Sequence, residues 1–244
     1  MCAREKNRFP SVSIACFLLF FAAIAVPAFA VVYQTDFSSD PNWTTNDPNN
    51  LYWDSVTQTY HALHANGSSK YAYVLVDYTP GQSFCLRFDQ IIDQVPNGAG
   101  ATVGVFNSSI DLLGTGVASH WVLVSGDYWS NLYAGNPVGT AASEVSDWEP
   151  NVWYTVQLEY DSSTNIAKMQ GWEKETGVEV TALTLLVSEG LPLDLDRIGI
   201  PKISCESLNI CEYRIDNLTF IPEPATLSLL VLGGAVVAAR RRKG

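Results

Sequence analysis

Alternation between apolar and polar residues is the sequence feature that most constrains this fold. From 152 to 160, an apolar or aromatic residue stands at every second position, beginning with Val152, and mostly polar residues stand between them. Successive side chains of a β-strand point to opposite faces, so this period of two predicts a strand with one buried face. Further segments rich in β-branched and aromatic residues predict more strands: 71–78, 84–92, 101–106, 121–124, 166–173, 178–187 and 213–220.

Turn-forming residues separate these segments, for example Thr79-Pro80-Gly81 and Glu175-Thr176-Gly177. No segment of about ten or more residues has the apolar stripe of an amphipathic helix. About ten to thirteen short strands in one domain predict an all-β fold, either a two-sheet antiparallel sandwich or a barrel, and the sandwich is commoner at this strand number.

The N-terminus has the pattern of an export signal. Basic residues at 4, 6 and 8 precede an apolar stretch at 14–26, and Ala28 and Ala30 form a small-x-small cleavage site. We therefore expect signal peptidase to remove 1–30. The folded domain is then predicted to comprise 31–221.

The C-terminus combines a rigid tripeptide, a short apolar segment and a basic end. Pro222-Glu223-Pro224 precedes the apolar residues 225–239, and Arg240-Arg241-Arg242-Lys243 follow them. The apolar segment is shorter than the ~20 residues of an ordinary transmembrane helix, and its basic end is expected on the cytoplasmic side. The two prolines exclude helix at the tripeptide, which we expect to be extended and accessible to solvent.

Residues 222–244 resemble the PEP-CTERM sorting signal of Gram-negative bacteria. Pro222, Glu223 and Pro224 match its motif, and Arg240, Arg241 and Arg242 match its basic end. The resemblance implies transient insertion into the inner membrane and processing by an exosortase, a membrane protease-transpeptidase. It also implies delivery to the cell surface or to an extracellular polysaccharide matrix. An ordinary single-span tail anchor is the alternative interpretation.

The charge of the predicted domain excludes nucleic acid as a partner. The chain has 14 Lys and Arg and 25 Asp and Glu; residues 1–30 hold 3 basic and 1 acidic, and 222–244 hold 4 basic and 1 acidic. The remaining 7 basic and 23 acidic residues give a net charge of −16, which repels polyanions. In an oxidising compartment Cys205 and Cys211 could close a small loop, leaving Cys85 single on a strand.

Three short segments resemble concanavalin A-like, laminin-G-like jelly rolls: Asp36-Phe37 with Trp43, residues 153–161 and residues 213–218. The resemblance implies a jelly-roll sandwich whose first and last strands pair, which would bring Asp36 near Asp216. Two such carboxylates could hold a structural calcium ion, which requires six to eight oxygen ligands. In the alternative interpretation Asp36 caps a turn and Asp216 faces solvent.

Signatures of catalysis are weak. A retaining jelly-roll glycosidase needs two carboxylates about 5–5.5 Å apart, and the nearest sequence approximations, at 144–149 and 173–175, do not fit that spacing on one strand. An inverting pair on separate strands stays open. On a strand His61 and His64 would point to opposite faces, so we expect structural or surface roles for them and for His120.

Aromatic residues interleaved with Asp and Asn suggest glycan contacts, because a ring packs on a sugar face while amides and carboxylates take its hydroxyls. The candidates are Trp53, Asp127, Trp129 and Asn131. The favoured alternative is that the rings of Trp53 and Trp129 fill the sandwich, as we expect of Trp153 and Tyr154.

Three functions follow as hypotheses. The first is a non-catalytic, glycan-binding surface protein. The second is a glycoside hydrolase or lyase on a jelly-roll scaffold, and the third is a purely structural matrix protein.

Overall fold

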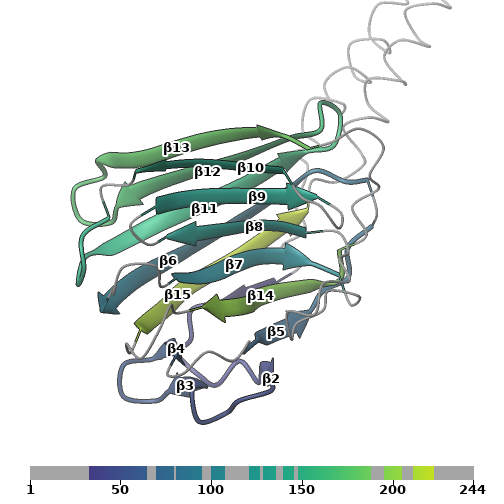
Figure 1. The fold of residues 1–244 in the computed structure, drawn as a ribbon. Helices are drawn as coiled ribbons and strands as arrows, with labels where there is room; N and C mark the ends of the chain where they lie inside the picture. Colours follow the sequence, from purple (N-terminus) through teal and green to yellow (C-terminus); the bar gives the residue numbers. More distant parts are fainter. Residues whose placement is uncertain are drawn as a thin grey trace, which may run out of the picture. The chain divides into compact units, whose positions relative to one another are not determined.

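The computed structural model describes residues 33–64, 70–79, 81–94, 100–107, 121–126, 129–135, 140–145, 148–187, 195–204 and 211–222. These residues form strands and connecting turns, in two antiparallel sheets that lie face to face (Figure 1). The predicted all-β sandwich is therefore confirmed, and the described residues alone form fifteen strands, where ten to thirteen were expected.

Sheet A contains the first and last strands of the domain. Its order is β13 (Glu179–Leu186), β12 (Ile166–Glu173), β11 (Trp153–Asp161), β6 (Phe84–Gln94), β15 (Cys211–Pro222), β4 (Thr59–His64) and β3 (Leu51–Asp54), with β1 (Tyr33–Thr35) also paired to β15. The expected pairing of first and last strands is confirmed, because Thr35 lies opposite Leu218.

Sheet B forms the second layer. Its order is β10 (Thr140–Val145), β9 (Trp129–Gly135), β8 (Trp121–Gly126), β7 (Gly100–Phe106), β14 (Arg197–Ser204), β5 (Ala72–Leu75) and β2 (Thr44–Thr45). Neighbours in both sheets are distant in sequence, as in β6–β15 and β7–β14, so the fold depends on long-range pairing.

The core lies between the sheets and is rich in aromatic side chains. Phe84, Phe88 and Phe220 are fully buried there, and the ring centroids of Phe84 and Phe220 lie 5.6 Å apart. Each of these rings alternates along its strand with a residue on the opposite face. The apolar half of the predicted alternation therefore faces sheet B, and the polar half faces outward from sheet A.

Two irregularities shape the strands next to this core. At Gly199 in β14 the register shifts, φ is +147°, and a Cβ would lie 2.3 Å from the Ala72 carbonyl oxygen. In β15 the register shifts between Asp216 and Thr219, and Asn217 has φ of +50°. The first site requires glycine, and the second bends the closing strand.

Candidate functional site

The sorting segment begins within the sandwich. Strand β15 continues to Pro222, which lies opposite Phe84 of β6 and is buried. The expectation of a wholly exposed tripeptide is therefore wrong at Pro222, because this residue completes a strand pairing. Glu223, Pro224 and the basic end lie outside the described residues, as does the predicted transmembrane segment 225–239.

A row of side chains crosses the outer face of sheet A, the face turned away from sheet B. Cross-strand register aligns Tyr52 of β3, His61 of β4, Arg214 of β15, Ile91 of β6 and Trp153 of β11. Residues directly opposite one another in antiparallel strands share a face. We call these five residues the outer-face row.

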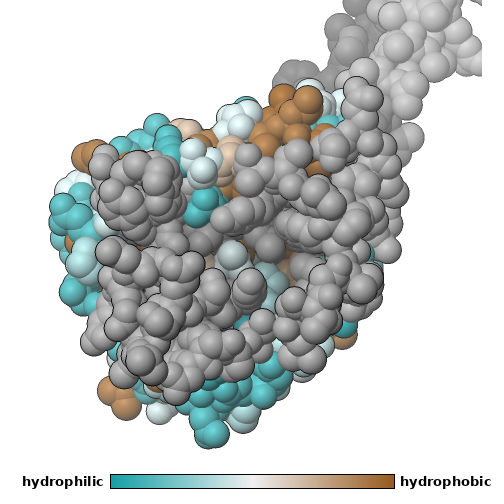
Figure 2. Space-filling model, viewed as in Figure 1, coloured by the Kyte–Doolittle hydropathy of each residue, from teal (hydrophilic) through white to brown (hydrophobic). Residues whose placement is uncertain are grey.

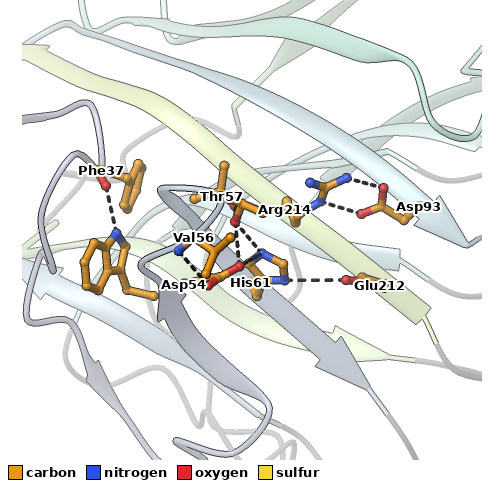
Figure 3. Close-up of polar contacts among 10 residues, drawn as sticks. Phe37, Asp54, Val56, Thr57, His61, Asp93, Glu212 and Arg214 are labelled. Atoms are coloured by element: carbon orange, nitrogen blue, oxygen red, sulfur yellow. Dashed lines mark hydrogen bonds and ion pairs between the residues drawn. The ribbon is translucent and has the colours of Figure 1, made fainter.

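His61 lies at the centre of the polar contacts in Figure 3. Its Nε2 is 3.0 Å from Thr57 Oγ1 and 3.6 Å from Asp54 Oδ2, and its Nδ1 is 3.4 Å from Glu212 Oε1. Tyr52 stacks on the imidazole with ring centroids 5.2 Å apart. The histidine is therefore a buried structural residue placed between two carboxylates.

The protonation of His61 is set by burial. Its side chain is 8% exposed, and desolvation together with the Arg214 charge lowers the pKa of the imidazole. The carboxylates of Asp54 and Glu212 act in the opposite direction, but they are the smaller effect. The Nδ1 atom is buried and makes no hydrogen bond of normal geometry, so the ion-pair contact with Glu212 is a loose one.

Arg214 is held by a forked contact with Asp93. Arg214 Nε donates to Asp93 Oδ2 at 2.6 Å, and Arg214 Nη2 donates to Oδ1 of the same carboxylate. The hydrogen bond to Asp93 raises the pKa of the guanidinium. Arg214 and Lys174 also approach the ring of Trp153, at 5.7 and 5.4 Å from its centroid.

Trp153 therefore corrects one prediction. We expected it inside the sandwich with Tyr154, but it is half-buried on the outer face, beside two cations. The alternation of β11 accounts for this, because Tyr154 takes the inward position, where its ring contacts Trp148.

A second polar network lies one step along the sheet and is centred on Asp89 of β6. Its carboxylate accepts hydrogen bonds from Thr155 Oγ1 at 2.6 Å and from Asn217 Nδ2 at 2.9 Å, and it pairs with Lys174 Nζ at 2.8 Å. Asp89 is only 7% exposed. The network joins β6, β11 and the irregular part of β15.

The predicted neighbours Asp36 and Asp216 lie beside this network. Asp36 follows the end of β1 and accepts a hydrogen bond from the Ser38 N–H at 3.0 Å, which is a turn cap. Asp216 is half-buried; burial raises the pKa of its carboxyl, and the charges of Asp89 and Asp36 act in the same direction.

The calcium site predicted at Asp36 and Asp216 stays a prediction. The two carboxylate oxygens of Asp216 accept hydrogen bonds from the backbone N–H and the side-chain amide of Asn217, and Lys174 supplies a positive charge beside Asp89. Within the described ranges, no three His, Cys, Asp or Glu side chains are placed to share a metal. A calcium ion here would therefore need most of its six to eight oxygens from backbone carbonyls, side-chain amides or water.

The glycan candidates fall in different places. Trp53 packs against the core, and its indole N–H donates to the Phe37 carbonyl at 2.7 Å (Figure 3). Asn131 is half-buried in β9, opposite Ser125 and Ser143. Asp127 lies outside the described residues, and for Trp129 only the backbone position, at the start of β9, is described.

Other predicted positions also lie outside the described residues: the cleavage residues Ala28 and Ala30, Cys205 and His120. The backbones of His64 and Cys211 belong to β4 and β15, but their side chains are not described. The disulfide between Cys205 and Cys211 thus stays a prediction. Cys85 lies on strand β6, as expected.

The carboxylates considered for catalysis have structural contacts. Glu144 belongs to β10 and accepts a hydrogen bond from Thr181 Oγ1. Glu173 accepts one from Thr176 Oγ1 at 2.7 Å within the turn after β12. These contacts hold the ends of strands and do not place a pair across a substrate.

Sequence reasoning missed the outer-face row. The sequence contained part of the signal, because the alternation of β15 and β6 places Arg214 and Asp93 at polar, outward-facing positions. What the sequence could not give was the strand order that brings β3, β4, β15, β6 and β11 side by side.

Comparisons with known proteins agree with the predicted C-terminal sorting segment and with the fold. Residues 220–243 match the PEP-CTERM protein-sorting motif. The chain therefore carries a signal for export and for membrane anchoring before exosortase processing. No helix that could span a membrane occurs in the described part of the chain. A sequence comparison with curated proteins gave no match.

Solved plant lectins share the fold. Peanut lectin with a nine-residue peptide is 15% identical, with a TM-score of 0.58 over 78% of this chain and 96% of that one. Winged bean acidic lectin, complexed with methyl-α-D-galactose, is 12% identical, with a TM-score of 0.60 over 78% and 97%. Lectin I-B4 from Griffonia simplicifolia, in a metal-free form, is 16% identical, with a TM-score of 0.57 over 78% and 97%.

Proposed function

We propose that this protein is an exported, non-catalytic module that binds glycan at the cell surface or in an extracellular polysaccharide matrix. One observation carries the proposal: a sandwich with the fold of plant lectins runs, through its closing strand, directly into a PEP-CTERM motif. In this proposal 1–30 is a signal peptide removed by signal peptidase, and 225–239 inserts transiently into the inner membrane.

The acidic surface restricts the class of ligand that the domain can bind. A predicted domain with a net charge of −16 repels polyanions such as nucleic acid and sulfated or uronate-rich polymers. On the basis of charge, a neutral polysaccharide is therefore a better ligand than an anionic one. In Figure 2 much of the described surface in view is hydrophilic, with a brown cluster at the top, and the large exposed hydrophobic residues are Val56, Leu75, Val178 and Leu186.

A non-catalytic role fits the contacts of the carboxylates better than hydrolysis does. Glu144 and Glu173 are engaged in strand-end hydrogen bonds, and Asp89 is neutralised by Lys174. A general acid would need a carboxyl with a raised pKa facing a cleft. Asp216 has a raised pKa, but its oxygens contact Asn217.

Affinity electrophoresis tests the proposal. The exported protein, purified from its producing cells, is run through gels that contain single polysaccharides, with calcium and then with chelator. Retardation by a neutral polysaccharide is the expected result, and its loss with chelator would bring calcium into the binding reaction. Equal mobility in every gel, with intact protein, would favour the structural matrix protein instead.

A further inference from the structure

A polar cleft of about 570 Å³ lies at the end of sheet A where β15 leads into the sorting segment. Its lining includes Cys85 of β6, Glu159 and Asp161 of β11, and Lys168 of β12. Register places Glu159 opposite both Cys85 and Lys168, so these side chains share the outer face. The volume is within the range of small-ligand sites.

Charged groups in this cleft are left available. Glu159 and Lys168 are direct cross-strand neighbours of opposite charge, yet within the described ranges they do not form an ion pair. Glu159 Oε1 accepts one hydrogen bond, from Gln157 Nε2 at 2.6 Å, and a carboxylate has about four acceptor positions. Lys168 is exposed and supplies three donors.

The wall of the cleft is a hydroxyl-rich turn with a fixed shape. Asp161 accepts hydrogen bonds from Ser163 Oγ at 2.7 Å, from Thr164 Oγ1 at 2.8 Å and from the Ser163 N–H at 2.9 Å. These bonds lower the pKa of the Asp161 carboxyl, which keeps it ionised and unsuited to act as an acid. Ser83 Oγ accepts from the Ser162 N–H at 3.0 Å and joins this turn to β6.

We propose that this cleft binds an uncharged saccharide segment, with sugar hydroxyls donating to Glu159 and accepting from Lys168. The inference rests on the proposed function and locates it. The aromatic residues of the lining, Phe84 and Tyr160, are 2% and 3% exposed and belong to the core, so recognition is through hydroxyls rather than ring stacking. The cleft has two carboxylates, Glu159 and Asp161, and one ammonium group, Lys168, so its net negative charge disfavours a uronate or a sulfated sugar.

The first test combines affinity electrophoresis with substitutions in the exported protein. The probes are dextran, glycogen and galactomannan, with alginate as the anionic comparison. Glu159→Gln should weaken retardation by a neutral probe about tenfold, since the amide keeps an acceptor oxygen but loses the charge that strengthens the hydrogen bonds from the sugar. Lys168→Ala should act in the same direction. Glu175→Gln, the same change on an exposed turn, is the matched control and should leave retardation unchanged.

The second test needs no substitution. Amide hydrogen exchange across 159–168 in the wild-type protein should slow when the retarding probe is added. If a neutral probe binds but Glu159→Gln binds equally and this exchange is unchanged, the cleft assignment is overturned while glycan binding stands. If no probe retards the folded wild-type protein, both the cleft and the proposed function fail for these glycans. Binding of alginate alone would overturn the neutral-ligand assignment.

Discussion

Replacing Asp89 by alanine should destabilise the sandwich more than any exposed acidic substitution. The carboxylate is 7% exposed and accepts the Thr155 hydroxyl at 2.6 Å, where Thr155 is itself 7% exposed. Without Asp89 this buried hydroxyl loses its charged partner. A hydrogen bond to a charged group contributes about 1.5–3 kcal/mol when both partners are buried.

The other two contacts of Asp89 add less. Asn217 is exposed, so water can replace the bond from its amide, and the Lys174 side chain is 40% exposed and can turn to solvent. We therefore expect a loss of about 2.5 kcal/mol in the free energy of unfolding. For a domain of this size that corresponds to a fall in melting temperature of about 5–10 °C.

Urea unfolding followed by tryptophan fluorescence measures this loss. Glu175→Ala, on an exposed turn, is the control and should change stability by less than about 0.5 kcal/mol. A double-mutant cycle with Thr155→Val should give a coupling of about 1.5 kcal/mol between the two side chains. A loss below about 1 kcal/mol for Asp89→Ala, or no coupling, would refute the assignment of this network as a stabilising contact.

Three further predictions concern His61, Gly199 and the sorting motif. Because the pKa of His61 is lowered in the folded protein, the unfolded chain binds its proton more readily. Stability should therefore fall as pH drops below about 6.5. Between pH 7.5 and 5.5 the melting temperature of His61→Gln should change less with pH than that of the wild-type protein. Equal slopes of melting temperature against pH in the two proteins would contradict this. Gly199→Ala should cost about 3 kcal/mol or prevent folding, because its Cβ would lie 2.3 Å from the Ala72 oxygen; urea unfolding checks it. Glu223→Ala should leave unprocessed protein in the membrane fraction on an immunoblot, and normal processing would argue against recognition of the tripeptide.

Sequence alone predicted the fold because alternation and a few motifs determine which face of each strand is buried. The inward positions of β11 and β15, such as Leu158 and Phe220, follow directly from the period of two. The predicted segments did not cover β1, β2, β3, β4, β9, β10 and β14. Those strands of two to four residues carry little periodic signal. The prediction for Trp153 was wrong because its aromatic character indicates a core residue, whereas its position in the alternation indicates the outer face, where it lies.

The candidate cleft could not be predicted, for a different reason. Glu159 and Asp161 stand two apart on one strand, and that spacing was visible in the sequence. Their chemistry, however, depends on Lys168 lying opposite Glu159 and on Ser83 joining the next turn. Both depend on pairings between strands, and the pairing of β6 with β11 spans a large part of the chain.

The closing strand and the sorting-motif match share residues. Phe220 and Ile221 belong both to the sorting-motif match and to β15, and Pro222 pairs with Phe84 in the same strand. A proline at the last pairing position of a strand supplies a carbonyl but no N–H, so hydrogen bonding cannot propagate beyond it through its own nitrogen. Pro222 is both the last described residue of β15 and the first residue of the tripeptide. A chain whose β15 has not paired would present Phe220 and Ile221 unfolded beside that tripeptide, whereas in the folded chain both residues, and Pro222 after them, are paired with β6.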